Sequence, residues 1–523
     1  MDLSILAVAA EAFPLAKTGG LGDAVSGLCR SLHHPGRSRV TLMLPAYRDA
    51  LARAGSLREC ARFPDLAGGP ATLLAGVAPS LGLPVLLLRN DALYDRDGVY
   101  GDAGGNEYPD NALRFAALAQ AAARVARGGG GAPRPDIVHA HDWHAALIPV
   151  YLKQMRTHDV RTMLTLHNIA FQGIFPLSLA RALGIQPEFC GGGAGRAEPL
   201  NFLEAGIRHA DLISVVSRNY AREILTPAFG CGLESVLAAR AADTIAIANG
   251  IDMSIWDPQA DEYLQGLNFG IDRMENKAAC KRLLQESFGL APDPRAAVLA
   301  LGSRITGQKM ADVAAQALPV ALDGHPDLQV CILGRGEKRL ESALQALAQR
   351  YPGRCAVQIG FRESQAHLLH AGADILLHGS RFEPFGLTPL YAMRYGTIPI
   401  GSRVGGMADT IRDAGSAEGF EPMREATGVL FEGDSIAEMA AAIDRALALW
   451  RRPAIWRAMQ RNAMRTDFGW ARAAPQYLRA YRALCPAHLP GAPVPAPADR
   501  VREGKRPWRP GLREHADTAW TTP

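Results

Sequence analysis

The sequence predicts an α/β protein with two doubly wound, Rossmann-like domains that face a central cleft. The chain has 523 residues, which is more than one hydrophobic core usually serves. Short apolar runs alternate with longer amphipathic stretches, a pattern typical of parallel sheets covered by helices. The alternation occurs twice, before and after the turn Asn249–Asp252. We therefore expect one sheet on each side of that turn.

The composition narrows the class of protein. A hydrophobic content of 48% with 21% charged residues is typical of a soluble globular protein, and the net charge of +4 is too small to indicate nucleic-acid binding. No apolar run is long enough to span a membrane, and the chain opens on a strand without a basic leader. We expect a cytoplasmic protein. The eight cysteines form no C-x-x-C pair, so neither a zinc site nor a redox motif is predicted.

Polar residues follow two strands of the first series. His139, His141 and Asp142 lie in or after one apolar run, and His167 and Asn168 follow another. Ligands of doubly wound sheets bind beyond the carboxyl ends of the strands. We therefore expect all of these side chains at that edge. The first series consists of strands at Leu3–Ala10, Val40–Pro45, Pro84–Leu88, Met163–Leu166, Leu212–Ser217 and Thr244–Ala248, a further strand that begins the segment Asp136–His144, and a long helix at Asn111–Ala126.

The segment Lys17–Asp23 lies between the first strand and a helix predicted over Asp23–Leu32. A glycine-rich turn before a helix N-terminus offers free backbone N–H groups to an anion, and Gly19 and Gly20 allow a close approach. Lys17 adds a positive charge. A plain turn with a surface lysine is the alternative, and it would be preferred if this segment stood alone.

The second series also ends its strands in polar residues. Arg304 and Lys309 flank the end of one strand, so both cations can converge on one diphosphate. The alternative is that both are ordinary surface charges in contact with solvent. Glu383 precedes a helix predicted over Leu387–Tyr395, whose N-terminal N–H groups suit a phosphate. Glu383 then binds sugar hydroxyls or simply caps the helix.

We divide the chain into four parts. Residues 1–250 form the N-terminal Rossmann-like domain and residues 251–470 the C-terminal one. Residues 471–485 form a helix that crosses back to the first domain. Residues 486–523 are rich in proline and arginine without apolar periodicity, so we expect a disordered tail.

Taken together, these segments resemble bacterial glycogen synthases and plant starch synthases, which are retaining glucosyltransferases of the GT-B fold. The resemblance covers Leu3 to Leu484, and its motifs occur in family order. Each motif alone is weak, whereas the set is specific. The matching segments are Lys17–Asp23, His139–His144, His167–Gly173, Asn249–Asp252, Ser303–Lys309, Ser380–Pro384 and Gly405–Thr410.

The resemblance implies transfer of glucose from ADP-glucose to the non-reducing end of an α-1,4-glucan such as glycogen, with retention. It makes Arg304 and Lys309 the groups that hold the donor diphosphate, with Lys17 contacting the phosphate from the first domain. It places His167 against the transferred glucose and Glu383 on the sugar hydroxyls. The remaining substrate-binding residues that it implies are Phe361 against adenine, Asp142, Asn168 and Asn249 on the sugar and acceptor side, and Gly19, Gly20, Gly386, Leu387 and Thr388 through their backbone.

No metal and no cofactor are implied, because two cations and two helix N-termini can neutralise the diphosphate. The single D-x-D, Asp95–Asp97, lies in a tyrosine-flanked segment and reads as a solvated loop. Two departures from the family are Met310, where glycine is usual, and Phe385, where many bacterial members have cysteine. Met310 puts the placement of Lys309 in question.

Two other functions stay open. One is a related transferase that uses the same donor on a small acceptor such as a sugar phosphate. The other is a non-catalytic glucan-binding protein, which predicts the loss of a charged cleft residue, whereas Lys17, Arg304, Lys309 and Glu383 are all present. For an enzyme, we also expect the two domains to close on the donor and exclude water.

Overall fold

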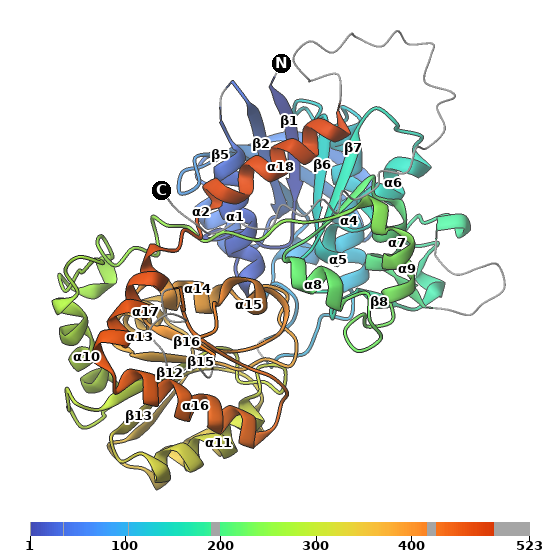
Figure 1. Cartoon of the computed structure of the whole chain (residues 1–523). Helices are drawn as coiled ribbons and strands as arrows, with labels where there is room; N and C mark the ends of the chain where they lie inside the picture. The colour runs from blue at the N-terminus through green and yellow to red at the C-terminus, as the bar shows by residue number, and fades with distance from the viewer. Residues whose placement is uncertain (1, 35, 103, 190–198, 416–424, 486–523) are drawn as a thin grey trace. The chain divides into compact units, whose positions relative to one another are not determined.

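A computed structural model describes residues 2–34, 36–102, 104–189, 199–415 and 425–485 (Figure 1). The chain divides into two compact units. Unit 1 contains the chain up to Val216, then Ala221–Gly250, and the helix that begins at Trp470. Unit 2 contains Ser217–Tyr220 and Ile251–Gly469. The tail predicted over 486–523 lies outside the described residues.

The sheet of unit 1 has nine strands, and most neighbours are parallel. Its central strands are apolar and almost wholly buried, which suits a sheet covered on both faces. In order across the sheet, the strands are β11 (Thr244–Ala246), β10 (Leu212–Val215), β7 (Arg161–Leu166), β6 (Ile137–His141), β1 (Leu3–Val8), β2 (Ser38–Pro45), β5 (Leu83–Arg89), β4 (Gly69–Ala78) and β3 (Leu57–Leu66).

One edge of this sheet differs from the prediction of parallel strands throughout. β3, β4 and β5 pair antiparallel, and β3 and β4 form a hairpin whose turn uses Gly68 at φ +76°. The hairpin was not predicted, because β3 contains Pro64 and mostly exposed side chains, so its apolar alternation is weak. Proline is tolerated there because β3 is an edge strand.

Helices and a short strand pair complete this part of the chain. Among them, α4 is almost wholly buried, because its alanine-rich sequence lets neighbouring elements approach it from several sides. The helices are α1 (Gly20–Leu32), α2 (Arg48–Arg53), α3 (Asp91–Tyr94), α4 (Asn111–Ala126), α5 (Asp142–Ala145), α6 (Ile148–Gln154), α7 (Phe202–His209), α8 (Arg218–Glu223), α9 (Glu234–Ala239) and α18 (Trp470–Leu484), and the pair is β8 (Ile174–Phe175) with β9 (Leu200–Asn201).

The last helix, α18, is red in Figure 1 and packs within unit 1. Trp470 lies so close to α1 that a Cβ on Gly27 would come 2.0 Å from the indole nitrogen. The hydroxyl of Tyr481 lies 2.7 Å from Nδ1 of His139 on β6. A chain that has left unit 1 at Gly250 therefore returns to its core after Gly469.

The sheet of unit 2 is parallel throughout its six strands, as predicted. The strand order reverses direction between β12 and β15, which is where ligands bind in doubly wound sheets. In order, the strands are β14 (Cys355–Ile359), β13 (Leu328–Gly334), β12 (Ala297–Gly302), β15 (Ile375–His378), β16 (Ile398–Ser402) and β17 (Val429–Phe431). The helices are α10 (Glu275–Phe288), α11 (Ala311–Gly324), α12 (Lys338–Arg350), α13 (Glu363–Gly372), α14 (Leu387–Arg394), α15 (Gly405–Thr410), α16 (Ile436–Trp450) and α17 (Pro453–Arg465). No helix among the described residues is long and apolar enough to cross a membrane.

Candidate active site

The glycine-rich turn of unit 1 is held by a carboxylate of the chain itself. Oε2 of Glu11 accepts hydrogen bonds from the backbone N–H groups of Thr18 (2.5 Å) and Gly19 (3.0 Å), and Oε1 accepts from the Tyr100 hydroxyl (2.5 Å). Burial raises the pKa of Glu11, although these donors oppose the rise. The prediction that these N–H groups are free for an anion is therefore wrong.

Lys17 lies beside this turn with its ammonium 3.0 Å from the carboxylate of Asp23. Helix α1 begins at Gly20, three residues before the predicted start, so both Lys17 and Gly19 precede its first turn. A Cβ on Gly19 would meet nothing within 4 Å, which leaves that face of the turn open. The turn therefore offers a lysine and an open glycine, while its N–H groups at Thr18 and Gly19 are already occupied by Glu11.

Asp142 joins the ends of two neighbouring strands. It begins α5 directly after β6, and its Oδ1 accepts from the backbone N–H groups of His167 (2.6 Å) and Asn168 (3.3 Å), which follow β7. Its backbone has φ +55°, a left-handed conformation that aspartate tolerates better than most residues. Burial raises the pKa of Asp142 to about 7, more than the two N–H donors lower it.

His167 is a neutral histidine at the carboxyl end of β7. Its Nε2 lies 3.0 Å from Nδ1 of His141, and burial lowers the pKa of His167 to about 3. His139, in contrast, does not reach this edge. It lies in the middle of β6 between Thr165 and Tyr481, so its predicted place at the edge is wrong. His139 and His141 face the same side of the sheet, because side chains alternate along a strand. His139 nevertheless lies two residues before the end of β6, so it stays within the sheet.

Two more predicted residues of unit 1 lie near strand ends. Asn168 uses its side-chain oxygen to accept the N–H of Ala170 at 3.1 Å. Asn249 is buried, and no hydrogen-bond partner for its Oδ1 is found within the described part of the chain. A buried amide oxygen without a donor is costly, so Asn249 is a candidate to bind a ligand hydroxyl.

In unit 2, Arg304 and Lys309 follow β12 but have different partners. The guanidinium of Arg304 is exposed and donates to Oε1 of Gln308 at 3.0 Å. The ammonium of Lys309 pairs with the carboxylate of Glu383. Met310 ends the turn at φ +53° and is fully buried, so the turn keeps the left-handed conformation that usually requires glycine. The loss of glycine there has not displaced Lys309 from Glu383.

Glu383 is a buried carboxylate with three donors nearby. Besides Lys309, Nε2 of His378 and Oγ of Ser380 each lie 3.2 Å from its Oε2. Burial alone would raise the pKa of Glu383, but the charge of Lys309 and the hydrogen bond from His378 hold it well below its ordinary value. Sequence reasoning missed His378, although it ends β15 just as His167 follows β7.

A recess of about 570 Å³ lies at the carboxyl ends of β13 and β14. Phe361 lines it with its side chain 63% exposed, so this ring has room for a planar ligand. Gly386 precedes α14, and Leu387 and Thr388 form its first turn, as predicted. The recess is lined by Ser287, Leu333, Gln358, Ile359, Gly360, Phe361, Arg362 and Gln365.

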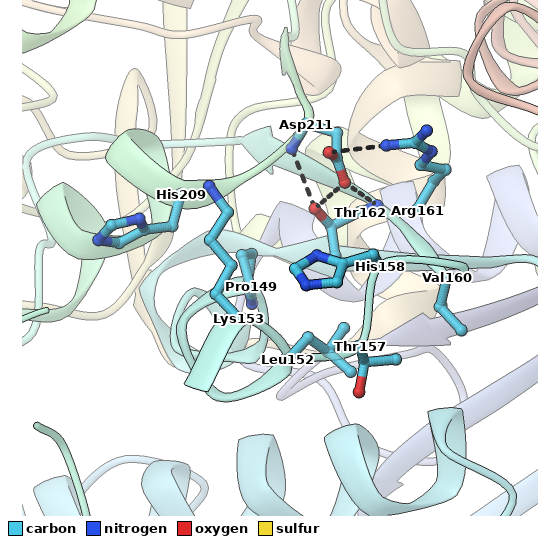
Figure 2. Close-up of a pocket in the computed structure, with 10 residues that line it drawn as sticks. All are labelled: Pro149, Leu152, Lys153, Thr157, His158, Val160, Arg161, Thr162, His209 and Asp211. Carbon is cyan, nitrogen blue, oxygen red and sulfur yellow. Dashed lines mark hydrogen bonds and ion pairs between the residues drawn. The ribbon is translucent and has the colours of Figure 1, made fainter. Parts of the chain in front are cut away.

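A second, smaller pocket of about 70 Å³ lies in unit 1, at the amino ends of the strands and thus opposite to Asp142 and His167 (Figure 2). It is formed around Arg161 and Asp211, at the amino ends of β7 and β10. The Asp211 carboxylate in it is already bound by the N–H and hydroxyl of Thr162, both at 2.8 Å. None of the predicted site residues lines this pocket.

The chain matches two family models. Residues 4–239 match the starch synthase catalytic domain, and residues 285–463 match glycosyl transferases group 1. A glycogen synthase of Bordetella petrii is 56% identical over 95% of this chain and 95% of its own length. One from Bordetella parapertussis is 58% identical over 94% of this chain and 97% of its own length. The chain belongs to the glycogen synthase family.

Solved structures agree with this assignment. The catalytic domain of starch synthase IV from Arabidopsis thaliana, bound to ADP and acarbose, superimposes with a TM-score of 0.83 at 26% identity, covering 92% of this chain and 99% of that domain. A sucrose-phosphate synthase from Thermosynechococcus elongatus shares the fold, with a TM-score of 0.56 at 18% identity over 93% of this chain and 100% of its own. The predicted GT-B fold and the predicted glycosyltransferase activity are confirmed.

The D-x-D segment of this glycogen synthase family member is paired internally. Both Asp95 and Asp97 form ion pairs with Arg48 on α2. In the ranges that the structure describes, no group of three or more histidine, cysteine or acidic side chains could hold a metal ion. The assignment of Asp95–Asp97 to a loop rather than a metal site is consistent with these contacts.

Proposed function

We propose that this glycosyltransferase transfers glucose from ADP-glucose to the 4-hydroxyl at the non-reducing end of an α-1,4-glucan, with retention. The observation that carries the proposal is the group Lys309, His378 and Glu383 at the point where the unit 2 sheet reverses its order. A cation and a carboxylate side by side there suit a sugar bound to a diphosphate. The related starch synthase IV has ADP bound.

Unit 2 provides the donor side in this proposal. Arg304 and Lys309 neutralise the diphosphate as the bond between the anomeric carbon and the phosphate oxygen breaks. The first turn of α14, at Leu387 and Thr388, adds backbone N–H groups and the positive end of the helix dipole. Phe361 and its recess accept the adenine, and Glu383 accepts hydrogen bonds from the glucose hydroxyls.

Unit 1 provides the acceptor side. His167 is neutral and rigidly held, so it can donate or accept a hydrogen bond against the transferred glucose without adding charge. Asp142 fixes the His167–Asn168 backbone, and Lys17 contributes its charge to the phosphate. The acceptor 4-hydroxyl forms the new bond on the face that ADP leaves and loses its proton to the leaving phosphate oxygen. We propose that no metal and no cofactor take part.

Product analysis with radiolabelled donors tests the proposal. ADP-glucose and UDP-glucose are each offered with glycogen and with glucose 1-phosphate, with and without excess chelator. We expect label from ADP-glucose in glycogen, released by an α-1,4-specific amylase, at the same rate in chelator. Label on the small acceptor alone would favour the alternative transferase. The absence of any transfer would contradict an enzymatic role, and a chelator-sensitive rate restored by magnesium would contradict metal independence.

A further inference from the structure

His378 is a buried imidazole whose hydrogen-bond partners, within the described residues, are Lys309 and Glu383 of the donor-side group. It is the last residue of β15 and only 3% exposed. Its Nε2 lies 3.2 Å from Oε2 of Glu383 and 3.3 Å from Nζ of Lys309. Its Nδ1 has no hydrogen-bond partner in the described ranges of the chain. The ring therefore interacts through one nitrogen with two oppositely charged groups.

These contacts determine where the ring proton lies. One nitrogen cannot donate to a carboxylate and accept from an ammonium at the same time. A proton on Nδ1 would bury an N–H without an acceptor, whereas a proton on Nε2 gives Glu383 a charge-assisted hydrogen bond. The hydrogen-bond geometry therefore assigns the proton to Nε2. Burial and the nearby charge of Lys309 lower the pKa of His378, so the ring stays neutral.

The ammonium of Lys309 has two possible partners, the carboxylate of Glu383 and the donor diphosphate. In the structure it pairs with Glu383. In the proposed reaction it also binds the donor diphosphate, which draws its charge away from that carboxylate. Two donors then remain for Glu383, the Nε2–H of His378 and the hydroxyl of Ser380 at 3.2 Å. His378 ends β15 and Ser380 follows it two residues later, whereas Lys309 precedes α11, so the two donors do not move with Lys309.

We propose that His378 is a positioning residue that keeps Glu383 aimed at the donor sugar while Lys309 binds the diphosphate. This inference rests on the proposed function and adds a residue to it. His378 acts through Glu383, so its removal affects binding and turnover of the glucosyl donor. The nucleotide itself is held by other residues, so ADP affinity does not depend on His378.

Paired substitutions separate this role from a structural one. H378Q places an amide N–H where Nε2–H lies, whereas H378M has a similar volume and no donor. We expect H378M to lower kcat/KM for ADP-glucose roughly 10- to 100-fold, the range for a hydrogen bond to a charged group. We expect H378Q to recover most of that loss. The affinity for ADP, measured by calorimetry, should stay within about two-fold of the parent in both variants.

Other outcomes would overturn the inference. An H378M variant with the kcat/KM of the parent would show that Glu383 needs no such support. Equal losses in both variants, accompanied by a lower Tm and weaker ADP binding, would show a structural role. If H378M fails to fold, H378N replaces it, because its shorter amide cannot reach Glu383. Parent turnover is measured first, since an inactive parent would overturn the proposed function itself.

Discussion

Asp142 combines a buried charge, a left-handed backbone and two hydrogen bonds to the chain at His167 and Asn168. Its pKa is raised from 3.8 to about 7 by burial. Between these values the folded protein binds a proton that the unfolded chain releases, so stability falls as the pH rises through that range. Above pH 7 the full destabilisation from burying the ionised carboxylate remains. An ionised Asp142 therefore lowers the free energy of unfolding, and in return the site contains a carboxylate at this position.

Asp142→Asn should remove that penalty. Asparagine tolerates the left-handed backbone and keeps an oxygen for the two N–H donors. We expect the Tm of the variant, relative to the parent, to rise between pH 5 and pH 8 by at least about 2–4 °C, the effect of roughly 1 kcal/mol in a domain of this size. Activity at pH 8 should fall. Thermal melts at both pH values check this, and a difference that stays constant or shrinks would contradict it.

Arg304 is exposed and its guanidinium donates to the side chain of Gln308, so its removal should hardly affect folding. If it stabilises the leaving diphosphate, Arg304→Ala should lower kcat by about a hundred- to a thousand-fold. Its Tm should stay within about 1 °C of the parent, because surface substitutions change stability little. Arg339→Ala, on the exposed face of α12, is the matched control and should leave both quantities unchanged. Near-parent activity of Arg304→Ala would refute the assignment.

At the scale of elements, one lysine joins three helices of unit 2. The ammonium of Lys277 on α10 donates to the carbonyls of Ala371 on α13 (3.0 Å) and Tyr395 after α14 (3.0 Å) and to the Thr397 hydroxyl (2.8 Å), and the His370 carbonyl lies farther away at 3.4 Å. Burial lowers the pKa of Lys277 to about 8. Because the helix ends supply carbonyl oxygens, the cation satisfies acceptors that would otherwise be buried without donors.

Lys277→Met should therefore destabilise the protein by roughly 2–4 kcal/mol, since it leaves several acceptors unpaired in the core. Urea unfolding followed by circular dichroism measures the loss. Lys338→Met is the control, because Lys338 is 80% exposed and its buried partner Glu341 also accepts the N–H of Gly336. We expect the control to change stability by less than about 0.5 kcal/mol. Equal effects of the two substitutions would show that the helix ends do not depend on Lys277.

At the scale of the whole molecule, each unit has its own sheet and its own buried core. Proteins with two such units need not unfold in one step. We expect scanning calorimetry to show two transitions. ADP at about 100 times its Kd should stabilise the unit that binds it by about 2.7 kcal/mol. Because the proposed nucleotide site lies in unit 2, ADP should raise mainly the transition of that unit.

Two glycine substitutions assign the transitions. A Cβ on Gly27 would lie 2.0 Å from Trp470, so Gly27→Ala should lower the transition of unit 1. A Cβ on Gly372 would lie 2.6 Å from the carbonyl of Cys280, so Gly372→Ala should lower that of unit 2. If ADP raises the transition that Gly27→Ala lowers, the donor side has been placed in the wrong unit. A single transition that responds alike to both variants would contradict independent units.

The fold class, and the strand ends at which the proposed site residues lie, could be predicted from local patterns in the sequence. Strand ends are local features, so His167, Arg304 and Glu383 could be found from apolar runs followed by polar residues. The family assignment could be made for a similar reason, because its motifs are short and occur in a set order. The antiparallel edge was missed since β3 lacks a clear apolar alternation.

Which groups meet in space depends on contacts between distant parts of the chain, and these could not be predicted from local patterns. Glu11 and Tyr100 are 89 residues apart, and Lys309 and Glu383 are 74 apart, so no local pattern predicts either pair. The N–H groups of Thr18 and Gly19 looked free because their acceptor, Glu11, lies just before the turn motif, and only the fold of the segment between them brings its carboxylate back to the turn. His378 matters for the same reason, since a strand-end histidine acquires a role only when a carboxylate and an ammonium fold against it.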